Sequence, residues 1–180
     1  EKLEDLSIYN VIENINIFNK FINLKKIFVH NTRPFDLYSI SNLENLNELH
    51  IRCRRIINIE SISKLINLRN LRIYITNLEP LSNLINLQEL NLSDNKITNI
   101  EPLSNLINLE KLDLSNNKIN NIEPLSNLEN LQTIDLSYNN ISDLKNLGNL
   151  INLNMLFIEN NPILSFDNNI PNNKCSIDTK

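Results

Sequence analysis

Residues 87–108 read LQELNLSDNKITNIEPLSNLIN, and residues 109–130 follow as LEKLDLSNNKINNIEPLSNLEN. The two stretches share their apolar positions and spacing, which identifies a repeat of 22 residues. Equivalent units begin at Leu24, Leu46, Leu68, Leu87, Leu109, Leu131 and Leu153, and a first unit fits near Leu3. The unit that begins at Leu68 is three residues shorter than the others. Eight units therefore cover residues 1–166, and we expect residues 167–180 to form a C-terminal capping segment and tail.

Within one unit the spacing of the apolar residues changes from two to about three. The alternation in L-x-x-L-x-L predicts a short strand whose leucines point to one side. The stretch I-x-x-I-x-P-L-x-x-L is too short for a stable α-helix and favours a 3₁₀ turn, which Pro80, Pro102 and Pro124 would begin. One unit cannot bury its own apolar face, so the units must stack. The prediction is a parallel sheet of about eight short strands, with turns on the other side.

The composition agrees with this and excludes several functions. Leu, Ile and Asn supply 97 of 180 residues, while Ala is absent and Gly148 is the single glycine. With one glycine, the sequence cannot contain the glycine-rich loops that bind dinucleotides or phosphates. The formal net charge of −4 argues against nucleic-acid binding. A steep salt dependence of oligonucleotide binding would revive that alternative.

The repeat LxxLxLxxNxIxxIxPLxxLxN resembles the 22-residue class of leucine-rich repeats. It is most similar to internalin-like repeats of bacteria and nearly as similar to those of the regulatory subunit of type-one protein phosphatase. The resemblance covers about residues 3–166 and implies an α/β solenoid whose concave parallel sheet binds another protein. We therefore expect no enzyme activity and no cofactor. The alternative is that the chain is the recognition domain of a larger effector enzyme.

Two classes of asparagine recur at fixed positions. Asn95, Asn117, Asn139 and Asn161 stand at the ninth position, where the chain leaves the strand. Asn23, Asn45, Asn67, Asn86, Asn108, Asn130 and Asn152 close the units. An asparagine side chain both donates and accepts, so it satisfies backbone groups of its own and adjacent coils. We interpret the first class as a structural ladder and the second as turn-stabilising residues.

Exposed strand positions vary between units and are the candidates for function. Position five reads Phe28, His50, Arg72, Asn91, Asp113, Asp135 and Phe157, and position seven reads His30, Arg52, Tyr74, Ser93, Ser115, Ser137 and Glu159. Residues 24–75 carry nine Lys and Arg against four acids, and ladder asparagine is replaced there by Thr32 and Arg54. Arg and Tyr are common at interface hot spots. We therefore predict a site for an acidic protein surface at Phe28, His30, His50, Arg52, Arg72 and Tyr74, with Arg33 and Arg55 at its rim.

Two alternatives stay open for these surfaces. For the basic residues, the alternative is that the outer units drifted in sequence and that their arginine side chains are solvated. A second, acidic patch of Asp113, Asp135, Phe157 and Glu159 would hold a basic partner or Ca²⁺, and otherwise serves solubility.

Other chemistry has little support in the sequence. His30, His50 and Cys53 are too loosely spaced for zinc, and no further ligand is evident, so we expect no metal. Cys53 and Cys175 lie about five coils apart, beyond disulfide reach. Two unpaired thiols favour the cytoplasm, although a processed secreted or surface protein stays possible. No apolar run is long enough for membrane insertion. We expect a monomer.

Overall fold

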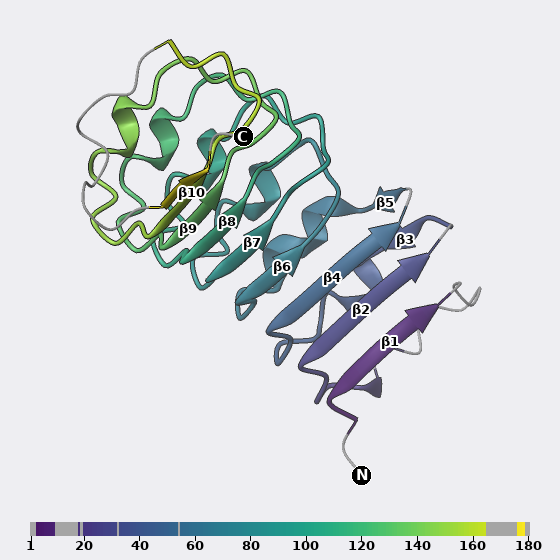
Figure 1. Ribbon diagram of the computed structural model, residues 1–180. Coiled ribbons are helices and arrows are strands. Elements are labelled where there is room, and N and C mark those ends of the chain that lie inside the picture. Colours follow the sequence, from purple (N-terminus) through teal and green to yellow (C-terminus); the bar gives the residue numbers. More distant parts are fainter. Residues whose placement is uncertain are drawn as a thin grey trace.

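The computed structural model describes residues 3–9, 18, 20–31, 33–53, 55–164 and 176–178. Each predicted unit contributes one strand to a single parallel sheet, which Figure 1 shows as a curved layer with the turns and 3₁₀ helices behind it. The strands lie side by side in chain order: β1 (Asp5–Tyr9), β2 (Lys26–Asn31), β4 (Glu48–Cys53), β6 (Asn70–Arg72), β7 (Glu89–Asn91), β8 (Lys111–Asp113), β9 (Thr133–Asp135), β10 (Met155–Phe157) and β11 (Ser176–Asp178). The predicted leucine-rich-repeat solenoid is confirmed.

The ninth strand is a difference from the sequence prediction. Strand β11 lies in the segment 167–180 that we expected to be a cap and tail, and it pairs with β10 in parallel. Its three residues, Ser-Ile-Asp, are too few to show a repeat, so a strand could not be predicted there from periodicity. Residues 165–175, between the last unit and β11, lie outside the described part of the chain.

Short 3₁₀ helices return the chain to the start of the next strand. They are η2 (Leu37–Ile40), η3 (Ile59–Lys64), η4 (Glu79–Leu81), η5 (Glu101–Leu103), η6 (Glu123–Leu125) and η7 (Lys145–Leu147). Pro80, Pro102 and Pro124 stand at the starts of η4, η5 and η6, as the spacing predicted. A second small sheet pairs β3 (Phe35–Asp36) with β5 (Ile56–Ile57) beyond the ends of β2 and β4.

The core consists of the repeated apolar positions. In the unit that begins at Leu109, seven such residues are at most 3% exposed: Leu109, Leu112, Leu114, Ile119, Ile122, Leu125 and Leu128. Leu6 and Ile8 of the edge strand β1 are only half-buried. In the described part of the chain no helix is long and apolar enough to cross a membrane.

The ninth-position asparagines join consecutive coils. Asn117 donates through Nδ2 to the carbonyl oxygens of Leu92 (2.9 Å) and Leu114 (3.0 Å), and its Oδ1 accepts from the N–H of Ile97 (3.0 Å). Asn139 and Asn161 make the equivalent bonds. Asn95 makes the equivalent donor bonds, from Nδ2 to the carbonyl oxygens of Ile73 and Leu92. These bonds satisfy backbone groups that the short strands leave unpaired. Thr32 and Arg54, which replace this asparagine earlier in the chain, lie outside the described residues.

The unit-closing asparagines also reach the preceding coil, which is more than turn stabilisation within one unit. Their Nδ2 atoms donate to a backbone carbonyl 20 or 23 residues earlier, at 2.8–2.9 Å, from Asn45, Asn67, Asn86, Asn108, Asn130 and Asn152. A third class, which the sequence analysis missed, starts the 3₁₀ helices. Asn77, Asn99 and Asn121 accept the N–H of the glutamate two residues later, at 2.9–3.1 Å.

Candidate functional site

The fifth position of every unit forms one continuous row across the sheet. Parallel pairing places each residue of the row directly opposite the next: Ser7, Phe28, His50, Arg72, Asn91, Asp113, Asp135, Phe157 and Asp178. Neighbouring strands lie about 4.8 Å apart, so adjacent side chains of this row from Ser7 to Phe157 are close enough to contact each other. The row therefore runs along the whole length of the solenoid.

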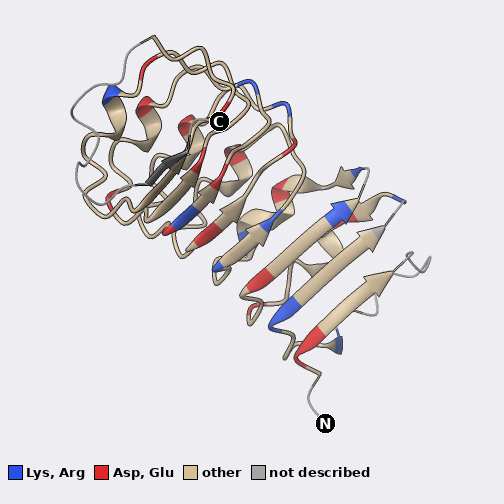
Figure 2. Cartoon of the chain, viewed as in Figure 1, with Lys and Arg blue, Asp and Glu red and all other residues tan. Residues whose placement is uncertain are grey.

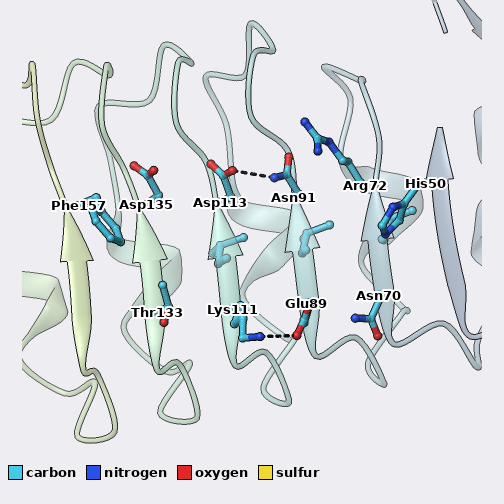
Figure 3. Close-up of a pocket in the computed structure, with 13 residues that line it drawn as sticks. His50, Asn70, Arg72, Glu89, Asn91, Lys111, Asp113, Thr133, Asp135 and Phe157 are labelled. Carbon is cyan, nitrogen blue, oxygen red and sulfur yellow. Dashed lines mark hydrogen bonds and ion pairs between the residues drawn. The ribbon is translucent and has the colours of Figure 1, made fainter. Parts of the chain in front are cut away.

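A hollow of about 390 Å³ opens on this face of the sheet (Figure 3). It extends from His50 on β4 to Phe157 on β10, and the buried residues Leu71, Leu90 and Leu112 contribute to its lining. Its other lining residues are Asn70, Arg72, Glu89, Asn91, Lys111, Asp113, Thr133 and Asp135. The hollow thus brings His50 and Arg72 of the predicted basic site together with Asp113, Asp135 and Phe157 of the predicted acidic patch.

The third-position side chains that line the hollow were not among the predicted site residues. Here Lys111 Nζ lies 2.7 Å from Glu89 Oε1, and one end of the sheet has the same arrangement, with Lys26 Nζ 2.9 Å from Glu48 Oε2. These hydrogen-bonded ion pairs raise the pKa of Lys111 and of Lys26. Figure 2 shows that acidic and basic residues alternate at the starts of β1, β2 and β4. The same alternation is visible in the sequence and could have revealed these residues.

The acidic side of the row is held by local hydrogen bonds. Asn91 Nδ2 donates to Asp113 Oδ2 at 2.7 Å, and Asp113 Oδ1 accepts from the N–H (3.0 Å) and the hydroxyl (2.6 Å) of Ser115. Asp135 Oδ1 accepts from the N–H of Ser137 at 2.9 Å. The carboxylates are therefore oriented before any ligand arrives. Among the described residues, neither aspartate has a Lys or Arg within ion-pair distance.

The basic side of the row combines aromatic rings with positive charge. Phe28 and His50 are in edge-to-face contact, with ring centroids 4.9 Å apart. Burial lowers the pKa of His50; Glu48, whose Oε1 lies 3.5 Å from Nε2, opposes this shift, and Arg72 adds to it. A lowered pKa keeps the imidazole neutral at pH 7, so Arg72 carries the positive charge at this end of the hollow.

The remaining residues of the predicted basic site lie around the hollow rather than in it. His30 is exposed, stacks on Tyr9 with centroids 5.4 Å apart, and lies opposite the exposed Arg52 in the next strand. Arg33 and Arg55 are exposed beyond the ends of β2 and β4. Tyr74 is half-buried after β6.

A second hollow of about 370 Å³ adjoins the first and shares Asp135 and Phe157 with it. Glu159, predicted for the acidic patch, lines it together with Asp94, Ser115, Asn116, Ser137 and Tyr138. Tyr138 has a φ of 57°, in the left-handed region, at a position where other units have Asp94, Asn116 and Asn160. A bulky residue is uncommon in this conformation, whereas Asn and Asp tolerate it.

Cys53 and the histidines form no site of their own in the described residues. Cys53 is a free, half-buried thiol that donates to the carbonyl of Arg55 at 3.3 Å, and burial raises its pKa. In the described part of the chain, no group of three or more His, Cys, Asp or Glu side chains is placed to hold a metal ion. Cys175 lies outside the described residues.

Comparison with known proteins agrees with this architecture. Residues 85–127 match the family model described as leucine rich repeats (2 copies). No curated protein matches the chain. Among solved structures, internalin C2 (inlC2) of Listeria monocytogenes strain 4b F2365 is 32% identical with a TM-score of 0.82, and the alignment covers 98% of this chain and 80% of that one.

Two further structures show the same fold over much of the chain. The internalin inlF of the same Listeria strain is 29% identical with a TM-score of 0.73, over 82% of this chain and 45% of its own. The plant peptide hormone receptor RGFR1, solved in complex with RGF2, is 25% identical with a TM-score of 0.68, over 87% of this chain and 27% of its own. The chain thus spans less than half of the inlF structure. On its repeats, its fold and its similarity to internalin C2, the chain belongs to the leucine-rich repeat proteins of internalin-like type.

Proposed function

We propose that the chain is a non-enzymatic module that binds a protein partner on the concave face of its sheet. The observation that carries this proposal is the hollow between His50 and Phe157, which combines aromatic, cationic and anionic side chains on one surface. A volume of about 390 Å³ is enough for several partner side chains. Among the comparisons, the RGFR1 receptor was solved with RGF2 bound.

The basic end of this face fits an acidic region of the partner. Arg52 and Arg72 are exposed on neighbouring strands, and the aromatic ring of Phe28 lies beside His50. Arginine and aromatic side chains provide much of the binding free energy at protein interfaces. Opposite charges across an interface also speed encounter and exclude partners of the wrong sign.

The test is capture from a phage library that displays fragments of proteins. We compare the wild-type chain with Arg52→Glu/Arg72→Glu and with the control Lys64→Glu/Lys145→Glu, which makes the same charge change on η3 and η7. We expect the concave variant to lose capture by about tenfold or more while the control retains it. Equal capture by the wild type and the concave variant, with both folded by circular dichroism, would place the site elsewhere.

A further inference from the structure

The two rows of strand residues that line the hollow, at the third and fifth positions, differ in how their charges are balanced. At the third position Lys111 is paired with Glu89 at 2.7 Å and Lys26 with Glu48 at 2.9 Å, so these charges are compensated within the sheet. At the fifth position the guanidinium of Arg72 has no ion pair or hydrogen bond among the described residues, and its charge faces the hollow. Within the hollow, the charges left for a ligand are therefore those of the fifth-position row.

These remaining charges are separated by sign along the solenoid. Arg72 lies on β6, whereas Asp113 and Asp135 lie on β8 and β9, and the neutral Asn91 lies between them. Figure 3 shows the side chains of Arg72, Asn91, Asp113 and Asp135 extending from the same face toward the carboxyl ends of their strands. At about 4.8 Å per strand, Arg72 is roughly 10 Å from Asp113 and roughly 14 Å from Asp135 along the row.

Each end of the hollow has the groups to hold a side chain of opposite charge. At the acidic end Asp135 uses Oδ1 for Ser137, while Oδ2 makes no hydrogen bond within the described residues, and the half-buried ring of Phe157 lies beside it. A carboxylate next to an aromatic face suits a lysine or arginine side chain. At the basic end the guanidinium of Arg72 suits a carboxylate, which it can hold through two N–H donors.

We propose that the hollow binds an extended segment of the partner that carries both an acidic side chain, placed at Arg72, and a basic side chain, placed at Asp113 and Asp135. An extended chain rises about 3.3 Å per residue, so the two charged residues are three or four positions apart. The segment runs across the strands, along the fifth-position row. This inference rests on the proposed function and specifies the chemistry of its ligand.

A bipolar ligand, one that carries both an acidic and a basic side chain, also explains how the face would discriminate between partner segments. A segment with only acidic residues meets Arg72 favourably but is repelled at Asp113 and Asp135, and a basic segment meets the opposite problem. Only a segment with both signs satisfies the whole length of the hollow.

The experiment uses a phage library of random dodecapeptides, selected on the immobilised full chain, and synthetic peptides made from the enriched sequences. Binding is measured by fluorescence polarisation at low and physiological salt. Arg72→Gln removes the positive charge. Asp113→Asn/Asp135→Asn removes the negative charges but keeps an oxygen for each serine, as Asn91 does when its Oδ1 accepts from the N–H of Ser93 at 3.2 Å. The matched controls are Lys64→Gln on η3 and Glu101→Gln/Glu123→Gln at the starts of η5 and η6.

We expect enriched peptides to contain an acidic and a basic residue three or four positions apart. Each neutralising change in the hollow should weaken their binding about tenfold, and each control less than about twofold. Purely acidic peptides that bind the Asp113→Asn/Asp135→Asn variant as well as the wild type would overturn the bipolar ligand and leave the proposed function standing. Failure to enrich any peptide would overturn the bipolar segment, whereas the proposed function fails only if capture of protein fragments is also independent of Arg52 and Arg72.

Discussion

The side-chain Oδ1 of Asn117 accepts a 3.0 Å hydrogen bond from the backbone N–H of Ile97, which belongs to the preceding coil. The same side chain is only 8% exposed, so water cannot replace it as the partner of that N–H. Consecutive coils are thus joined by buried side-chain bonds in addition to the strand pairing. This arrangement makes the ladder asparagines the polar residues on which stability should depend most.

Replacing Asn117 with Ala should lower the free energy of unfolding by about 3 kcal/mol. The change leaves the N–H of Ile97 buried without a partner, which costs roughly 1–3 kcal/mol, and it removes one of the two asparagine donors to the carbonyl of Leu92, where Asn95 remains. Urea denaturation followed by circular dichroism measures the loss. The matched control is Asn99→Ala, which removes one exposed bond to the N–H of Glu101 and should cost about 1 kcal/mol. Equal losses in the two variants would contradict a special role for the ladder.

Replacing Tyr138 with Asn should stabilise the chain by about 1 kcal/mol. Tyr138 has a φ of 57° and its side chain is 53% exposed, so the change relieves left-handed strain and gives up little buried area. The reverse change, Asn116→Tyr, affects the equivalent position one coil earlier, where φ is 54°, and should destabilise by at least as much, because it also removes the 2.6 Å bond from Asn116 Nδ2 to Asp94 Oδ1. Thermal or urea unfolding of the two variants tests this pair. A loss of stability in Tyr138→Asn would show that the tyrosine ring contributes more than the backbone strain costs.

The stability of the fold should decrease as pH falls below the ordinary histidine pKa of about 6.5, in part through His50. Burial lowers the pKa of His50, so the unfolded chain binds this proton more tightly than the folded chain does. The contribution of the neutral imidazole is therefore complete above about pH 6.5 and is lost as pH falls through the lower folded-state pKa. His50→Gln should make unfolding less sensitive to pH in this window.

The titration of His50 itself can be followed by NMR, with the signal assigned by comparison with His30→Gln. Arg72→Gln should raise the pKa of His50, because it removes a nearby positive charge, and Glu48→Gln should lower it further. A wild-type pKa at or above the ordinary value would contradict the burial argument.

Cys53 should react slowly with thiol reagents. Burial raises its pKa, and the thiolate is the reactive form, so at pH 7.5 the native protein should react about tenfold more slowly than the urea-unfolded chain. The measurement uses a Cys175→Ser background, so that only Cys53 is modified. Similar rates in the native and unfolded states would mean that the thiol is accessible and unperturbed.

The fold was predictable from the repeats because burial imposes the same residue type at each equivalent position. Leu112 and Ile119 are buried in one unit as Leu90 and Ile97 are in the unit before it. Replacing any of the four with a smaller residue would leave a void in the stacked core. Strand β11 escaped prediction because three residues carry too little periodicity. The asparagines that start the 3₁₀ helices were not predicted, because Asn is so frequent in the chain that a further recurring position does not stand out.

The candidate site was predictable only in part. Reading along the units found Arg72, Asp113 and Asp135 as variable exposed residues, but it assigned them to two separate patches. The structure puts all three in one hollow, because parallel pairing aligns the fifth positions and the curvature of the sheet turns them toward a common space. Glu89 and Lys111 were not among the predicted site residues, because their ion pair depends on contact between strands.

The coil and its stacking follow from the spacing of apolar residues along the chain, because this spacing specifies which side chains must be buried together. Which exposed residues share a surface is seen only in the folded chain. That depends on distances between residues about 20 positions apart, where Asn91 reaches Asp113 at 2.7 Å and Arg72 has no ion pair among the described residues. Such distances follow from strand register and sheet curvature, and these are properties of the stacked repeats rather than of any single one.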